Sequence, residues 1–202
     1  MKTETDTPLV ITGVTEEEFY SLDEDDDVDW QFLGGDLVRE PSASYQHETI
    51  FSFLAFLFQG YLEERGGGVA IGSRFAMRLD PKWSPEPDLL VVREERRHLI
   101  GPRRLEGPAD LVIEIVSGGH PELALRRKLP RYREARVPEI WTLDPFKRSI
   151  QVDVLTAGGY DTDTLTAGRL ATAVVPGFWI DVAWLWQEPL PSRHACLHQI
   201  LA

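Results

Sequence analysis

The chain has 202 residues, of which 43% are hydrophobic, and it carries a formal net charge of −12. This length and composition suit one domain with a full hydrophobic core. The single cysteine, Cys196, excludes an intrachain disulfide and a zinc cluster built on cysteines.

Two features of the sequence bear on location. The longest apolar stretch runs from Ile50 to Phe58, far short of the roughly 20 residues that span a bilayer. The first residues, MKTETDTPLV, lack the basic and apolar regions of a signal peptide. We therefore expect a cytoplasmic protein without a membrane segment.

The negative charge is distributed unevenly along the chain. Residues 1–29 hold 11 of the 33 acidic residues and one of the 21 basic residues. The remainder has 22 acidic and 20 basic residues, which leaves a net charge of −2. Eleven basic residues lie between Arg93 and Arg136. The net charge therefore does not exclude nucleic acid as a partner, although a solvated basic helix face explains the same pattern equally well.

The first elements in chain order are a short helix and a hairpin. Residues 15–20 predict the helix, because Thr15 followed three residues later by Glu18 forms a capping box. Residues 28–39 predict the hairpin, with its turn at Gly34-Gly35.

A long helix is predicted from Ser44 to Arg65. Ser42 or Ser44 would be its N-cap, and three consecutive glycines end it. Its apolar middle should lie in the core. No Gly-Lys-Ser/Thr follows the glycines, so they form a turn and not a phosphate-binding loop.

From Val69 the pattern changes to short apolar runs between turn-forming residues, which is typical of strands. A second helix is predicted at 121–136, with Pro121 in its first turn and Pro130 kinking or breaking it. The aromatic segment 174–186 predicts a final strand and a short helix. This order of elements predicts an α/β or α+β fold around a mixed sheet. The other predicted strands are 69–79, 88–92, 110–116, 138–143 and 149–155.

Two acidic residues and one lysine carry the clearest chemical signal. Asp88 opens one apolar run, and Glu114 interrupts another, where a charge must be paired, hydrogen-bonded or bound to metal. Two carboxylates on neighbouring strands suit a hard divalent cation, and the ammonium of Lys128 suits a metal-bound water and a phosphodiester. Taken one at a time, each has an ordinary explanation: Asp88 as a turn residue, Glu114 as an acid paired with an arginine, and Lys128 as a solvated lysine. Together they predict metal-dependent phosphodiester cleavage.

Four motifs occur in a specific order: PEPDLLVV (85–92), GPADLVIEIVS (107–117), Lys128 with Tyr132, and VPEIWTLDP (137–145). In this order the chain resembles the Uma-type restriction-endonuclease-like family of the PD-(D/E)XK nuclease superfamily, from about Phe32 to Trp186. The resemblance implies a restriction-endonuclease-like mixed central sheet flanked by helices, with an N-terminal hairpin. We expect three parts: an acidic N-terminal segment with a short helix (1–29), the nuclease domain (30–188) and a C-terminal tail (189–202).

The resemblance also implies an endonuclease that depends on Mg²⁺ or Mn²⁺, acts on nucleic acid, with DNA as the expected substrate, and forms a homodimer. The implied metal ligands are Asp88, Glu114 and the backbone carbonyl of Ile115. Lys128 would be the catalytic lysine, because Val116 stands where the superfamily motif has its lysine. Additional site candidates are Glu48, His47 and Tyr132, and the candidate nucleic-acid contacts are Arg126, Arg127 and Arg131.

The chain departs from the family pattern at several polar positions. Gly34 replaces the acid of the first hairpin turn, Gln31 a preceding glutamate, Gly118-Gly119 a proline-serine pair and Ala124 an aspartate. Each change removes a polar group that could support the metal or order a loop. The alternative is therefore a catalytically weakened or inactive nuclease-fold protein that acts as a nucleic-acid-binding or dimerisation module.

Overall fold

The computed structural model describes residues 9–22, 30–39, 43–72, 75–118 and 123–202. At its centre is a mixed sheet of six strands in the order β12-β11-β10-β9-β7-β4. Only β9 and β10 pair in parallel; the other neighbours are antiparallel. The strands are β4 (Gly68–Gly72), β7 (Leu89–Arg93), β9 (Leu111–Ile115), β10 (Glu139–Asp144), β11 (Ser149–Thr156) and β12 (Gly159–Leu165).

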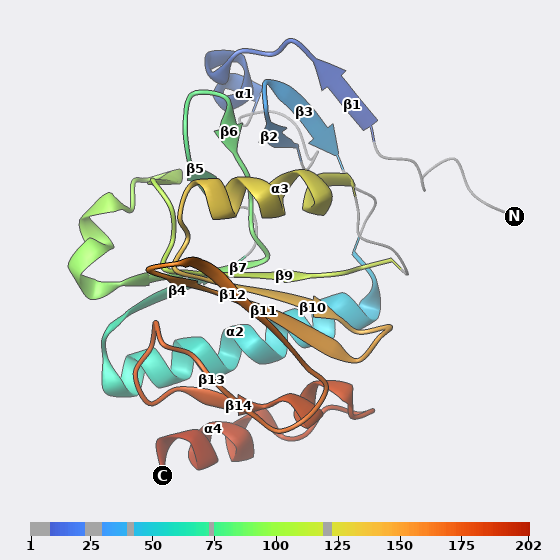
Figure 1. Ribbon diagram of the computed structural model, residues 1–202, viewed down its shortest axis with the longest axis vertical. Helices are drawn as coiled ribbons and strands as arrows, with labels where there is room; N and C mark the ends of the chain where they lie inside the picture. Colours follow the sequence, from blue (N-terminus) through green and yellow to red (C-terminus); the bar gives the residue numbers. More distant parts are fainter. Residues whose placement is uncertain (1–8, 23–29, 40–42, 73–74, 119–122) are drawn as a thin grey trace, which may run out of the picture.

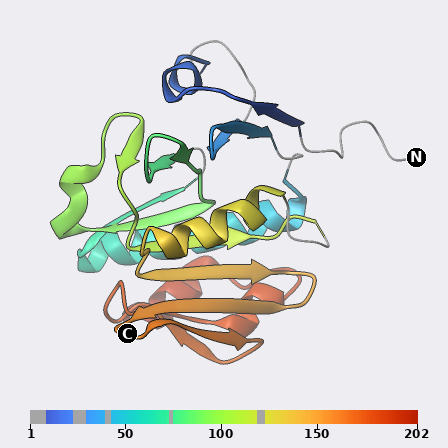
Figure 2. The same ribbon diagram turned by 45° about the horizontal axis from the view of Figure 1, so that its top comes forward.

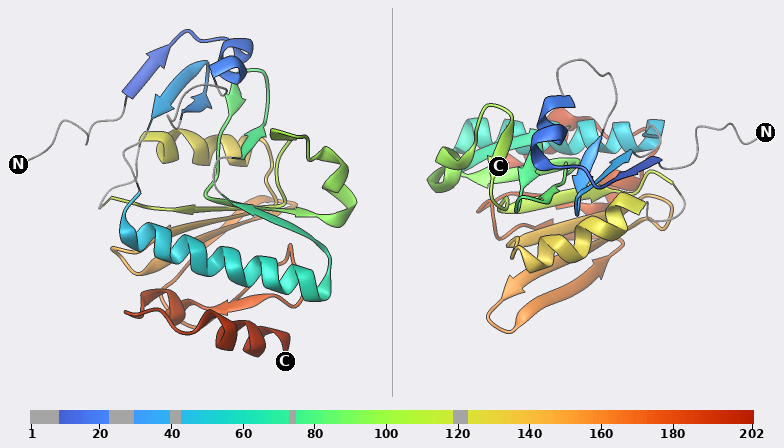
Figure 3. Two further views of the ribbon diagram at one scale, coloured as in Figure 1. Left: turned by 180° about the vertical axis from the view of Figure 1, so that it is seen from behind. Right: turned by 90° about the horizontal axis from the view of Figure 1, so that it is seen from above.

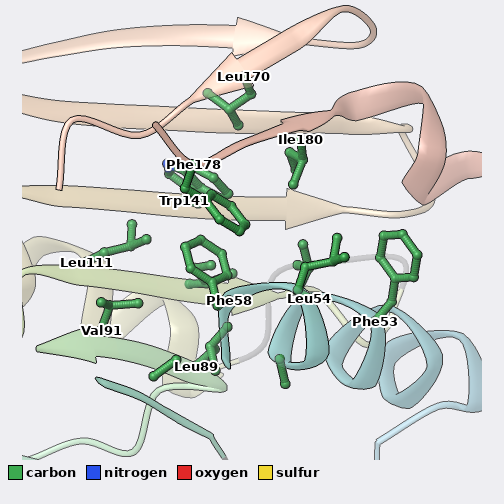
Figure 4. Close-up of a cluster of buried hydrophobic side chains, with 14 of the residues drawn as sticks. Phe53, Leu54, Phe58, Leu89, Val91, Leu111, Trp141, Leu170, Phe178 and Ile180 are labelled. Carbon is green, nitrogen blue, oxygen red and sulfur yellow. The ribbon is translucent and has the colours of Figure 1, made fainter. Parts of the chain in front are cut away.

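Helix α2 (Tyr45–Arg65) covers one face of this sheet (Figures 1 and 3). The Ser44 side chain accepts a hydrogen bond from the His47 N–H and caps the helix, and the chain leaves it at Gly66 with φ of 72°. Phe58 of α2 stacks on Phe178, with ring centroids 3.9 Å apart, in the largest apolar cluster (Figure 4). The long helix predicted from Ser44 to Arg65 is confirmed.

Helix α3 (Leu123–Glu134) crosses the other face and connects β9 to β10 (Figure 2). Because side chains alternate along a strand, Leu111, Ile113 and Ile115 of β9 join the cluster on the α2 side, whereas Val112 joins the cluster on the α3 side. Glu114 is two residues after Val112, so its side chain points to the same face of β9. It therefore faces α3.

A smaller sheet, in the order β1-β3-β2-β6, lies on the far side of α3 from the central sheet (Figure 1). Its predicted hairpin is confirmed, with φ of 76° at Gly34 and 83° at Gly35 in the turn. Helix α1 (Glu16–Leu22) precedes it, and the predicted capping box is present, with Thr15 N–H bonded to the Glu18 carboxylate. The strands are β1 (Leu9–Thr12), β2 (Gln31–Leu33), β3 (Asp36–Arg39) and β6 (Trp83–Ser84).

The C-terminal segments extend the core beyond α2. Strand β14 (Trp179–Asp181) and the 3₁₀ helix η3 (Val182–Trp186) confirm the strand and short helix expected in 174–186. Residues 193–201 form α4 (Arg193–Leu201), whose Leu197 approaches α2 so closely that a Cβ on Gly60 would lie 2.6 Å from it. Most of the expected tail 189–202 is thus packed against α2. Among the described residues, none of the helices has the length and hydropathy of a membrane span.

One expectation was wrong in detail. The predicted strand 69–79 is two strands in different sheets, β4 and β5 (Ala76–Arg78). The second helix, predicted at 121–136, is α3; of the two effects expected of Pro130, a break is excluded, because α3 continues to Glu134. Pro121 and Ser42, which were expected at helix starts, lie outside the described residues.

Seven elements of the described residues were not predicted from the sequence. They are the strands β1, β6, β8 (Arg104–Glu106), β12 and β13 (Arg169–Ala171), the 3₁₀ helix η2 (Glu94–Leu99) and helix α4. The predicted fold class, a mixed central sheet flanked by helices with an N-terminal hairpin, is confirmed.

Candidate active site

Glu114 lies at the centre of a buried polar cluster between β9 and α3. Its side chain is 4% exposed, and one carboxylate oxygen, Oε2, is 2.8 Å from Lys128 Nζ. The other oxygen, Oε1, accepts a hydrogen bond of 2.7 Å from the Tyr132 hydroxyl. Lys128 and Tyr132 are four residues apart on α3 and therefore project from the same face of the helix toward this carboxylate.

Asp88 lies next to Glu114, at the start of the neighbouring strand. β7 and β9 pair with Leu89 opposite Ile113, so the residue before Leu89 comes opposite Glu114. The Asp88 carboxylate accepts a hydrogen bond of 2.6 Å from the Ile115 N–H, and its side chain is 24% exposed. The two carboxylates thus occupy adjacent positions at one end of the sheet, where Asp88 reaches solvent.

His47 and Glu48 approach this pair from the first turn of α2. His47 Nε2 is 3.2 Å from Asp88 Oδ1, and the His47 side chain is 9% exposed. Glu48 Oε1 is 3.3 Å from His47 Nδ1, but the Glu48 side chain is 59% exposed. Burial lowers the pKa of His47, but the hydrogen bond and charge of Asp88, together with Glu48, outweigh burial and raise it overall. Glu48 therefore joins the cluster through His47.

Sequence reasoning missed a further acid beside the cluster. Lys128 Nζ donates a hydrogen bond of 3.3 Å to the Glu86 backbone carbonyl, and the Glu86 charge contributes to the raised pKa of Tyr132. The backbone N–H of Glu86 donates to Gln31 Oε1 at 3.4 Å. The signal in the sequence was the glutamate of the PEPD motif, two residues before Asp88.

The arginines proposed to contact nucleic acid differ in their surroundings. Arg127 donates to Asp36 on β3 at 2.9 Å, and Arg131 pairs with Asp80 and stacks over Trp83. Both therefore help attach the small sheet and its neighbouring loop to α3. The side chain of Arg126 is exposed.

The earlier part of the basic stretch has a structural role. Arg93 and Arg96 both donate to Asp110, whose side chain is fully buried, at 3.1 and 3.0 Å. An ionised carboxylate without these donors would be costly at this depth. These two arginines therefore stabilise the β7–β9 region.

Burial is the largest cause of the unusual pKa of Glu114. It raises the pKa from an ordinary 4.5 to about 7; the positive charge of Lys128 opposes this rise, and the negative charge of Asp88 adds to it. Glu114 consequently holds a proton in the folded protein at pH values where the unfolded chain has released it. Folding is then linked to proton binding between about pH 4.5 and 7.

A pH dependence of stability follows from this linkage. Because the folded-state pKa is raised, the contribution of Glu114 is fully present below pH 4.5 and is lost as the pH rises to about 7. In a chelator, we expect Glu114→Gln to gain stability relative to wild type over this range, at up to about 1.4 kcal/mol per pH unit. Urea unfolding at several pH values measures the difference. Glu134→Gln, at an exposed position, should show no trend, and an equally flat trend for Glu114→Gln would contradict the raised pKa.

The donor groups fit a divalent cation that prefers oxygen. Among the described residues, no three His, Cys, Asp or Glu side chains are arranged to hold a metal ion. Two neighbouring carboxylates are nevertheless enough for Mg²⁺, which keeps several waters and takes one or two carboxylates. The negative charge of Asp88 raises the pKa of Glu114. A cation between them would relieve this repulsion.

Comparison with known proteins agrees with the fold. A protein from Anabaena variabilis described as a "putative nuclease belonging to DUF820" has a similar structure, with a TM-score of 0.72 and 15% identity over 86% of this chain and 97% of that chain. At this identity the likeness shows the fold alone. No curated protein matches the chain. The family model Uma2, described as "Putative restriction endonuclease", matches residues 16–183. The match covers most of the chain, and this protein therefore belongs to the Uma2 family.

Proposed function

We propose that this protein is a metal-dependent endonuclease that hydrolyses phosphodiester bonds in DNA. The observation that carries the proposal is the convergence of Asp88, Glu114 and Lys128 at one end of the central sheet. The family description supports nuclease chemistry. Metal dependence and the choice of DNA rest on the donor set and on the resemblance.

Asp88 and Glu114 would hold Mg²⁺ or Mn²⁺, together with the backbone carbonyl of Ile115. When bound, the cation would lower the pKa of a water molecule and offset negative charge on the phosphate. Asp88 is fixed by the Ile115 N–H and by His47, so its orientation is set before substrate arrives. His47 is thus proposed as a positioning residue.

Lys128 and Tyr132 hold Glu114 from the α3 side. Lys128 supplies a positive charge that favours the ionised carboxylate, and it would orient the attacking water or offset charge on the phosphorus oxygens in the transition state. The Tyr132 hydroxyl fixes the second oxygen of Glu114 and has a pKa raised well above its usual range by burial, so it stays a donor. We assign Tyr132 to positioning.

Several parts of the proposal depend on the sequence and the resemblance. They are the phosphate contacts of Arg126, Arg127 and Arg131, the homodimer and the division into 1–29, 30–188 and 189–202. The ion pairs of Arg127 and Arg131 would have to open, or be shared, for these side chains to reach a phosphate. Glu48, at 59% exposure, would serve as an outer acid that holds His47.

The test is cleavage of supercoiled plasmid, single-stranded DNA and RNA with Mg²⁺, Mn²⁺ or a chelator. We expect metal-dependent cutting of DNA by wild type and none by Glu114→Gln. The exposed Glu134→Gln variant is the matched control and should cut like wild type. Equal cutting by Glu114→Gln and wild type would show that Glu114 is misassigned or that the activity is a contaminant.

One observation favours the alternative, a binding module without catalysis. Both oxygens of Glu114 already have hydrogen-bond donors, and at a pKa of about 7 the group is half protonated at neutral pH. A protein that binds DNA with salt-dependent affinity but cuts no substrate with either metal would support this alternative.

A further inference from the structure

A pocket apart from the candidate active site lies beside the first turn of α2. It has a volume of about 530 Å³, within the range of small-molecule sites. Figure 3 shows the start of α2 beside the segment that joins η3 to α4, which forms one wall, and the β10–β11 turn forms another. Its lining includes two aromatic rings, two carboxamides and one guanidinium, from Tyr45, Trp186, Gln46, Gln187 and Arg148.

This pocket and the candidate active site use two faces of the same helical turn. Tyr45, Gln46 and Thr49 line the pocket, whereas His47 reaches Asp88. At 3.6 residues per turn, Tyr45, Thr49 and Gln46 share one face, and His47 points away from it. His47 therefore connects the turn that lines the pocket to the carboxylate of Asp88.

The sheet places the pocket at the same end as the site. Thr142 of β10 pairs with Glu114 of β9, and the two strands run in parallel. Pro145, which lines the pocket, follows Thr142 by three residues. The carboxyl ends of parallel strands are where α/β sheets bind ligands. A chain of nucleotides bound at the carboxylates could thus extend into the pocket.

The chemistry of the lining suits a planar ligand with hydrogen-bonding edges. Tyr45 is 86% exposed, so folding gains little from an aromatic ring there. Exposed aromatic rings stack on unpaired bases, and carboxamides read base edges. The positive charge of Arg148 is offset by the negative charge of Glu188 in the same lining, so the pocket favours a neutral base over a phosphate.

We propose that this pocket binds an unpaired nucleobase of single-stranded DNA next to the phosphate that is cut. Tyr45 stacks on the base, and Gln46 and Gln187 hydrogen-bond to its edge. The inference rests on the proposed function, and it adds the substrate class: a strand with at least one unpaired base.

The experiment compares two labelled probes on the full chain carrying Glu114→Gln, which should leave them uncut. One probe is a short oligothymidylate, and the other is an abasic strand of the same length and charge. We expect the oligothymidylate to bind about tenfold more tightly, because stacking of one base on an aromatic ring has this magnitude. Adding Tyr45→Ala should remove the preference, and Tyr45→Phe should keep it. The control, Gln59→Ala, lies on the same helix in a separate pocket of about 490 Å³ and should keep it too.

Three results would overturn the proposal that the pocket binds a base. The first two are equal binding of the two probes and an unchanged preference in Tyr45→Ala. The third is a changed oligomeric state in Tyr45→Ala, which would make the pocket an interface between copies. Failure of the proposed function looks different. Base-dependent binding without any cleavage by wild type would refute the nuclease and leave the base pocket intact. Cleavage by wild type without base preference would refute the pocket alone.

Discussion

Replacing Lys128 by methionine should lower metal-dependent DNA cleavage by about 100-fold or more while the protein stays folded. The size follows from losing a positioned charge or proton donor in the transition state. The fold should survive because Glu114 can take up a proton once its partner is gone. Burial already raises its pKa to about 7, and Lys128 is the main group that lowers it. A neutral carboxyl, still bonded to Tyr132, is tolerated at this depth.

The pH profile separates two ways in which Lys128 could act. If it only keeps Glu114 ionised, cleavage by Lys128→Met should recover at high pH, where the carboxyl loses its proton without help. If it acts on the water or the phosphate, as proposed, the loss should persist.

Arg133→Met is the matched control for this substitution. It removes another cation from α3 that pairs with a buried carboxylate, that of Asp153 on β11. Asp153 keeps hydrogen bonds from Gln151 and Thr162, so its carboxylate remains satisfied. We expect Arg133→Met to cleave within a few-fold of wild type. Undiminished cleavage by Lys128→Met would refute the catalytic role of the lysine.

The elements that sequence reasoning located carry their own local signals. Thr15 and Glu18 form a capping box, Ser44 caps α2, and Gly34-Gly35 adopt the positive φ values that a tight hairpin turn requires. Such signals act over four or five residues, so a sequence displays them directly. Glu114 was found in the same way, as a charge inside an apolar run.

The missed elements depend on distant partners. β12 contains Asp161 and Asp163, which are exposed, and its segment has no apolar alternation; pairing with β11 makes it a strand. Its pairing thus overrides a weak local preference. Helix α3 also continues through Pro130, which local preference disfavours.

The same distinction between local signals and tertiary contacts applies to the candidate site. Sequence reasoning predicted Asp88, Glu114 and Lys128 as site residues, but not how they meet. His47 reaches Asp88 from the other side of the sheet, and the proximity of Glu86 to Tyr132 depends on how α3 docks. No spacing within the chain encodes these contacts. Nor could the sequence show that Arg93 and Arg96 are committed to buried Asp110.

Glu139 in the core is another residue whose contacts the sequence does not reveal, and its substitution has the largest expected effect on stability. It is 1% exposed at the start of β10, and its carboxylate accepts from Trp141 Nε1 at 2.6 Å, from Thr172 Oγ1 at 2.7 Å and from the Ala173 N–H at 3.0 Å. These bonds attach the segment before β14 to the central sheet. Sequence reasoning passed over this residue because it lies at the edge of an apolar run.

We expect Glu139→Ala to lower the free energy of unfolding by about 3 kcal/mol or more, because several buried donors lose their acceptor at once. Glu139→Gln keeps the shape but turns an amide nitrogen toward a donor, so it should cost less. Asp161→Ala, at an exposed position of β12, should change stability by less than about 0.5 kcal/mol. Urea unfolding measures all three. A Glu139→Ala protein as stable as Asp161→Ala would mean that water replaces the lost acceptor, and that this network contributes little to holding the C-terminal segment on the sheet.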